Sequence, residues 1–210
     1  VILGAGFGGL RAALQIDKKI RRGNLAGIAE VILIDRNAYH TYTPTLYEAA
    51  TTSKNSATYQ EIKRIVTFAI PEIVKHTGIR FIQDEAKSLD LKDGDIHLGS
   101  GEMVKFDSLV LALGAETNWF GIPGLKEHSF PLKTFLDSVK IRDRIFELMQ
   151  SGKSDLNILV GGGGSTGVEL SGEIQGWIKE LQEELHNQCR SKVTIIEAGA
   201  SLMLGFPAGI

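Results

Sequence analysis

Two stretches decide the fold: VILGAGFGGL, residues 1–10, and NILVGGGGSTGVEL, residues 157–170. In each, a short apolar run leads into a Gly-x-Gly-x-x-Gly spacing. The glycines are Gly4, Gly6 and Gly9 in the first copy and Gly162, Gly164 and Gly167 in the second. Apolar residues at helical spacing follow each copy, and a second apolar run then ends in an acid, Asp35 or Glu197. The pattern predicts a strand, a glycine turn, a helix and a parallel second strand, present twice.

The glycine spacing has a chemical reading. The first glycine permits a tight turn, the second lets a pyrophosphate approach the backbone, and the third lets the helix pack on the sheet. The diphosphate then lies against the positive end of the helix. Asp35, 26 residues beyond Gly9, and Glu197 can accept hydrogen bonds from an adenosine ribose. One such spacing is a weak signal, but two complete units predict an α/β fold with two Rossmann-like dinucleotide-binding units.

Two dinucleotide sites in one chain suggest two cofactors that exchange electrons, and FAD and NADH are the natural pair. The glycines alone do not say which unit holds which. Glu197 is followed by AGAS, without a nearby Arg or Lys. A 2′-phosphate would face an acid there, so NADH is favoured over NADPH.

Composition excludes several other classes. The chain has 210 residues, 43% of them hydrophobic and 23% charged, and a net charge of −2. These values indicate a globular protein without a basic nucleic-acid footprint. The one cysteine, Cys189, excludes an intrachain dithiol pair and a cysteine-based zinc site, and no metal site is predicted. No apolar run approaches the length of a membrane span.

The segments between the glycine turns are read from local pattern. We expect a loop with a short helix over 36–58, a helix over 59–75 ended or bent at Pro71, a three-stranded antiparallel meander over about 78–106, a buried parallel strand ending at Gly114, an amphipathic helix over 132–150 and a long helix after Gly167. Leu136, Val139, Ile145 and Leu148 are expected to form the buried stripe of the 132–150 helix. The predicted division is an FAD-binding domain over 1–114 and an incomplete NAD(H)-binding domain over 115–210, with a linker at about 115–131. Because the chain begins inside a strand and stops shortly after another, we read it as the N-terminal part of a longer protein.

Three stretches carry a resemblance: RNAYHTYTPTLYEAAT after Asp35, LVLALGAETNWFGIPGL, and GGGGSTGVELSGEI. With the order of the segments, they resemble the two-dinucleotide-binding flavoproteins called pyridine nucleotide-disulfide oxidoreductases, and most closely the type II NADH dehydrogenases. The resemblance implies that the first unit holds FAD and the second NADH. It also implies that NADH reduces the flavin by hydride transfer and that electrons pass on to a quinone.

The cofactor contacts predicted from the turns and the resemblance form two sets. They are Gly4, Gly6, Phe7, Gly8, Gly9, Asp35, Arg36, Thr43, Pro44, Ala86, Ala112 and Gly114 for FAD, and Gly162, Gly164, Ser165, Thr166, Gly167 and Glu197 for NADH. By resemblance, Thr43 and Pro44 lie near the isoalloxazine and Ala86 near the adenine. The acid is Asp35 where many members have a glutamate.

Three points stay open at this level. Glu169 matches a glutamate near the nicotinamide–flavin contact and is the catalytic candidate, but an acid in the first turn of a helix is also explained by the helix dipole. His40 and its neighbouring tyrosines either gate a flavin or pack a loop. The alternatives in function are a soluble ferredoxin- or rubredoxin-type reductase and a non-catalytic NADH-binding redox sensor. The resemblance further implies a cytoplasmic enzyme, peripheral on the inner face of the cell membrane through C-terminal helices, and leaves a homodimer open.

Overall fold

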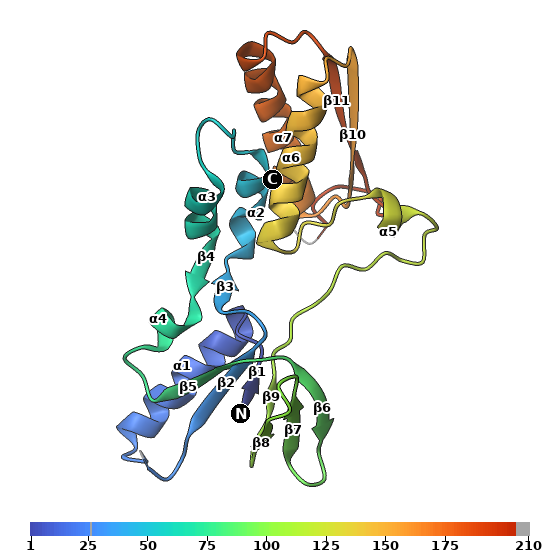
Figure 1. The fold of residues 1–210 in the computed structure, drawn as a ribbon. Coiled ribbons are helices and arrows are strands. Elements are labelled where there is room, and N and C mark those ends of the chain that lie inside the picture. Colours follow the sequence, from blue (N-terminus) through green and yellow to red (C-terminus); the bar gives the residue numbers. More distant parts are fainter. Residues whose placement is uncertain (26, 205–210) are drawn as a thin grey trace. The chain divides into compact units, whose positions relative to one another are not determined.

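The computed structural model describes residues 1–25 and 27–204 (Figure 1). Residue contacts divide the chain into two compact units. The first contains Val1–Thr41 and Thr67–Glu116, and the second contains Tyr42–Val66 and the chain from Thr117 onwards. The contacts thus group the chain differently from the predicted division at residue 114, because Tyr42–Val66 packs with the later part. Which cofactor each part serves stays a prediction.

The first unit is built on a parallel sheet with the strand order β5-β2-β1-β9. Its strands are β1 (Ile2–Leu3), β2 (Val31–Asp35), β5 (Ile79–Gln83) and β9 (Val110–Leu111). Helix α1 (Phe7–Arg22) connects β1 to β2, and these strands pair in parallel, as predicted. The helix buries Leu10 and Ala13 against the sheet, because residues three apart share one helix face.

A separate three-stranded antiparallel meander packs against this sheet and confirms that part of the fold prediction. Its strands are β6 (Ala86–Asp90), β7 (Asp95–Leu98) and β8 (Met103–Lys105). The predicted start at residue 78 is wrong, because Ile79–Gln83 pairs in parallel with β2. The strand predicted to end at Gly114 is present and pairs in parallel with β1, as predicted, but it ends at Leu111 and is not buried. β9 is a short strand at the edge of the sheet, and Leu111 is 59% exposed.

The single helix predicted over 59–75 is wrong. Helix α3 (Tyr59–Val66) gives way to strand β4 (Thr67–Ala69), and α4 (Ile70–Val74) follows. β4 pairs antiparallel with β3 (Tyr39–Thr41), so pairing with a distant strand overrides local helical pattern. Pro71 lies in the first turn of α4, where its missing N–H costs no helical hydrogen bond.

The second unit contains the second copy of the strand–helix–strand pattern. β10 (Asp155–Gly161), α7 (Ser165–Glu184) and β11 (Arg190–Ile196) follow one another, and β10 pairs in parallel with β11 through seven matched positions. Figure 1 shows α6 (Phe135–Gln150) and α7 beside this sheet. Helix α5 (Leu125–His128) lies in the expected linker.

Helix α6 begins at a capping box, in which Thr134 and Asp137 satisfy each other's backbone N–H groups. Its buried side includes Phe135, Ile145 and Met149. Leu136 was expected on this side, but it is 51% exposed, so that prediction is wrong. Phe135, one position earlier and 1% exposed, takes the buried place.

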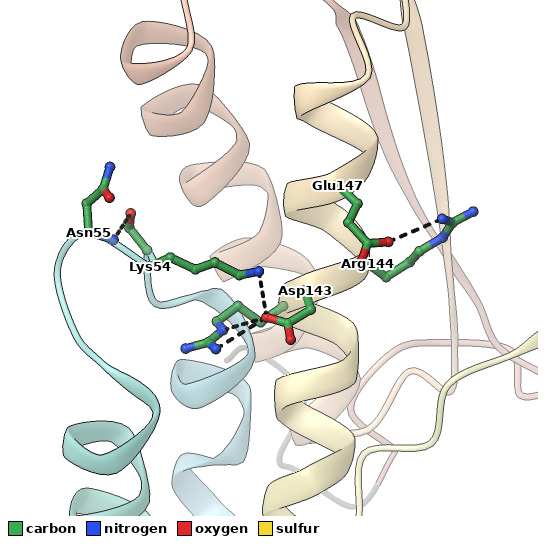
Figure 2. Close-up of polar contacts among 7 residues, drawn as sticks. Lys54, Asn55, Asp143, Arg144 and Glu147 are labelled. Carbon is green, nitrogen blue, oxygen red and sulfur yellow. Dashed lines mark hydrogen bonds and ion pairs between the residues drawn. The ribbon is translucent and has the colours of Figure 1, made fainter.

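The segment between the two parts of the first unit contains η1 (Thr43–Thr45) and α2 (Leu46–Thr51), followed by α3. Its attachment to the second unit is partly ionic: Lys54 Nζ lies 3.1 Å from Asp143 Oδ1 on α6 (Figure 2). Asn55 Nδ2 donates to Glu184 on α7, as does Ser53 Oγ at 3.1 Å. Ala50 packs into the apolar cluster formed by α6, α7 and β10. These contacts explain why a segment read as loop and helix belongs to the later unit.

Within residues 1–25 and 27–204, no helix has the length and apolar character needed to cross a bilayer. The same residues contain no cluster of three or more His, Cys, Asp or Glu side chains arranged to hold a metal ion.

Candidate dinucleotide-binding sites

The first glycine loop joins β1 to α1, and two of its glycines are required by the protein itself. Gly4 has a φ of +97°, in the left-handed region that side chains rarely adopt. A Cβ at Gly4 would also lie 2.3 Å from the carbonyl oxygen of Ala112. A Cβ at Gly9 would lie 1.7 Å from the Gly4 carbonyl oxygen. No side chain fits at either position, because the strand, the turn and the helix pack backbone to backbone.

The second glycine loop joins β10 to α7 and repeats this geometry. Gly162 has a φ of +108°. A Cβ at Gly167 would lie 1.9 Å from the Gly162 carbonyl oxygen. The first and third glycines of both copies therefore have the roles that the spacing predicts.

The middle glycines, Gly6 and Gly164, are different. They are the N-caps of α1 and α7, with φ,ψ of −71°, −170° and −75°, −178°, in a region that any residue adopts. No heavy atom lies within 4 Å of a Cβ built at either position. Neither helix has a side-chain cap at its N-terminus. Open space in front of uncapped backbone N–H groups fits a diphosphate, so the residues present suit the predicted dinucleotides.

The two strand-end acids bind their own glycine loops. Asp35 Oδ2 accepts a hydrogen bond from the Ala5 N–H at 2.7 Å. Glu197 Oε2 accepts one from the Gly163 N–H at 2.6 Å. Ala5 and Gly163 occupy the same place, between the first two glycines of each copy. Each acid thus holds its own glycine loop in place. The same acids were predicted to bind a ribose at the edge of these loops.

The second carboxylate oxygen of Glu197 accepts from the Gly199 N–H at 2.7 Å. The hydrogen bonds from Gly199 and then Gly163 hold the pKa of Glu197 below its usual value, because they stabilise the ionised carboxylate. An ionised acid at this position can accept hydrogen bonds from ribose hydroxyls.

His40 contacts the first loop through both a hydrogen bond and its ring. Its Nδ1 lies 3.0 Å from the Ala5 carbonyl oxygen, and its ring meets the ring of Phe7 edge to face at 4.7 Å. Of the two interpretations left open for His40, these contacts support packing against the loop. His40 lies on β3, whose pairing with β4 joins residues about 28 positions apart. The local sequence pattern does not predict this pairing.

The remaining residues predicted around FAD lie in different places. Ala112 packs under the first loop, and its N–H donates to Leu3 of β1. Ala86 begins β6 and is half-buried, whereas Arg36 and Gly114 are exposed. Thr43 and Pro44 lie in η1, in the second unit. The structure therefore gathers the glycine turn, Asp35 and Ala112, and the place of Thr43 and Pro44 beside a flavin stays a prediction.

Glu169 is the fifth residue of α7, and the first turn of that helix contains no acidic residue. The alternative that Glu169 acts only through the helix dipole was based on a first-turn position and is wrong, because the dipole effect is confined to that turn. Glu169 is exposed. Burial and the charges of Glu48, Glu169 and Glu173 raise the pKa of Tyr47, so these groups share one region of α2 and α7.

Comparison with known proteins shows one family match over the whole chain. Residues 1–210 match the family described as pyridine nucleotide-disulphide oxidoreductase. A type II NADH:quinone oxidoreductase of Staphylococcus epidermidis is 31% identical over 211 residues, which cover 97% of this chain and 50% of that protein. The chain thus spans about half the length of the curated relatives it matches.

Solved structures agree on the fold. The structure of NDH2 from Plasmodium falciparum in complex with NADH superposes with a TM-score of 0.75 at 26% identity, covering 99% of this chain and 43% of that one. The NADH:rubredoxin oxidoreductase of Clostridium acetobutylicum matches with a TM-score of 0.60 at 21% identity, covering 94% and 57%. The second likeness is one of fold alone.

Proposed function

Because the chain belongs to the pyridine nucleotide-disulphide oxidoreductase family, we propose that it forms the FAD- and NADH-binding part of an NADH:quinone oxidoreductase. The observation that carries this proposal is the pair of glycine loops. In both, the first glycine has a positive φ and the third packs against the first, while the middle glycine faces open space at a helix N-terminus. A chain with two such loops has two places for a dinucleotide diphosphate.

The first loop would hold FAD. The N-terminus of α1 at Gly6 would receive the diphosphate, and Asp35 would bind the adenosine ribose. The second loop would hold NADH in the same way, with Gly164 at the diphosphate and Glu197 at the ribose. FAD supplies the capacity to accept a hydride and release its electrons to another acceptor. The protein's own part is to bind the two dinucleotides and orient them.

A quinone is the electron acceptor that the curated relatives' names support. Glu169 has the chemistry for this half of the reaction, because quinone reduction consumes protons and an exposed carboxyl group can relay them. The likeness to the rubredoxin reductase is one of fold, and nothing in residues 1–25 and 27–204 favours an iron–sulfur partner. Attachment to the inner face of the cell membrane and dimer formation rest on the resemblance and stay predictions.

The experiment that tests the proposal compares the two middle glycines in the full-length protein. The unmodified protein should be yellow, and it should oxidise NADH when a quinone analogue is present. Gly6→Ala should weaken FAD binding and leave NADH binding unchanged, and Gly164→Ala should do the reverse. Both variants should fold, because the added Cβ meets no protein atom within 4 Å. A colourless protein that FAD does not reconstitute would contradict the proposal.

A further inference from the structure

Both backbone polar groups of Ala5, in the first loop, are held by side chains. Its N–H donates to Asp35 Oδ2 at 2.7 Å, and its carbonyl oxygen lies 3.0 Å from His40 Nδ1. A carbonyl oxygen can only accept, so Nδ1 of His40 carries the proton of this hydrogen bond. Ala5 is 2% exposed and His40 is 8% exposed. The hydrogen bond is therefore shielded from water, where losing one partner is costly.

The geometry of a peptide bond extends this contact to the next residue. The Ala5 carbonyl and the Gly6 N–H belong to one planar unit, and in a trans peptide they point in opposite directions. All peptides among the described residues are trans. When His40 holds the Ala5 carbonyl, it turns the Gly6 N–H away from itself. Gly6 on one side of this peptide permits backbone angles that a residue with a side chain would not, so the peptide can rotate unless something holds it.

We propose that His40 is a positioning residue of the first dinucleotide loop. It sets the direction of the Gly6 N–H through the peptide group that joins Ala5 to Gly6. The inference rests on the proposed function, because it takes the ligand of that N–H to be the diphosphate of FAD. It adds a residue that the glycine pattern does not contain. A loop already held in its binding conformation loses less entropy when the ligand binds.

The second loop offers an internal comparison. The Gly163 carbonyl oxygen accepts a hydrogen bond from the Met203 N–H at 2.7 Å, and the Gly163 N–H is held by Glu197. Both backbone polar groups of Gly163 are thus held as well, but its carbonyl oxygen accepts from a backbone N–H rather than from a side chain. Substitutions of His40 should therefore act on the first loop and leave the second unchanged.

Two substitutions in the full-length protein distinguish the effect of the His40 hydrogen bond from the effect of its ring packing. His40→Asn places an amide N–H close to the position of Nδ1, whereas His40→Phe keeps a ring against Phe7 and removes the donor. His97→Phe, on the exposed face of β7, is the matched control. Hydrogen exchange of the flavin-free protein is followed over residues 4–9 and, for comparison, 162–167. FAD affinity is then measured by titration.

We expect His40→Phe to speed exchange over residues 4–9 and to weaken FAD binding by about tenfold, the effect of losing one buried hydrogen bond. His40→Asn should stay within about threefold of the unmodified protein, and residues 162–167 should not change. Two results would overturn the inference: an unchanged rate of hydrogen exchange over residues 4–9 in His40→Phe, or an equal loss of FAD affinity in His40→Phe and His40→Asn. If the unmodified protein binds no FAD, the proposed function fails, and the exchange rates still decide whether His40 holds the loop.

Discussion

The two glycine loops share a backbone and differ in the side chains around it. In both, the first glycine has a φ near +100°, the third packs on the first, and a strand-end acid holds the peptide between the first two. The helices then begin differently, with Phe7 and Gly8 in the first copy and Ser165 and Thr166 in the second. The comparison teaches that the glycines and the acid build the loop, while neighbouring residues give each copy its own chemistry.

A further difference lies two residues beyond the third glycine. The first copy has Arg11 there and the second has Glu169. Both side chains are exposed on their helices. A positive charge in one copy and an acid in the other, at matched positions, show that the loop itself requires neither charge.

The largest expected effect comes from the feature that the loops share. Gly9→Ala and Gly167→Ala each place a Cβ less than 2 Å from a backbone carbonyl oxygen. Each should lower the free energy of unfolding by about 1–3 kcal/mol and abolish binding of its own dinucleotide. Chemical denaturation and cofactor titration of the full-length protein measure both effects.

Gly176→Ala is the control for this pair. Gly176 is exposed within α7, and no atom lies within 4 Å of its Cβ position. Alanine there should raise the free energy of unfolding by about 1 kcal/mol through helix propensity. Retained FAD affinity in Gly9→Ala would show that the third glycine does not shape the site.

The matched pair Glu169 and Arg11 should give the next largest effect. Glu169→Gln should slow flavin reoxidation by a quinone about a hundredfold, the scale of lost acid–base catalysis, and it should leave reduction by NADH nearly unchanged. Arg11→Gln should change neither step. Stopped-flow absorbance follows bleaching and recovery separately. Equal reoxidation rates in Glu169→Gln and the unmodified enzyme would remove Glu169 from the reaction.

Of the two strand-end acids, Glu197 and not Asp35 should determine which coenzyme the enzyme prefers. The unmodified enzyme should prefer NADH to NADPH at least about tenfold in kcat/KM, because a 2′-phosphate beside the Glu197 carboxylate is repelled. Glu197→Gln should reduce that preference, and Asp35→Asn should leave it unchanged while weakening FAD binding. Steady-state rates with both coenzymes test this, and equal use by the unmodified enzyme would contradict the assignment of Glu197 to the ribose.

The smallest expected effect is on the acid stability of the second loop. The pKa of Glu197 is lowered in the folded protein by hydrogen bonds from Gly199 and Gly163. Its contribution to stability is therefore complete above the usual glutamate pKa and is lost as pH falls through the lowered value.

Denaturation at pH 7 and at pH 4 measures this loss. The unmodified protein should lose slightly more stability on acidification than Glu197→Gln does. Glu180→Gln, an exposed change on α7, is the control and should behave like the unmodified protein. An identical pH dependence in Glu197→Gln would indicate that the Gly163 and Gly199 hydrogen bonds add no stability.

Local spacing predicted the parts of the fold whose residues are close in sequence. Both strand–helix–strand units, their parallel pairing and the antiparallel meander were predicted and are confirmed. Prediction was wrong where distant pairing decided the outcome. β4 is a strand because it pairs with β3, although its residues continue a helical pattern, and Ile79–Gln83 joins β2 although it precedes a meander.

For the candidate site, too, the sequence predicted the features that depend on local spacing and did not predict those that depend on distant contacts. By itself the sequence determined which glycines turn the chain and which acids end the second strands, because these depend on local backbone geometry and short spacing. Only the tertiary structure showed that Asp35 and Glu197 hold their own loops, that His40 reaches Ala5 from 35 residues away, and that Glu169 lies beyond the first turn of α7. Such contacts depend on which strands pair and where a helix begins. Those are set by packing over the whole unit rather than by any stretch of the chain.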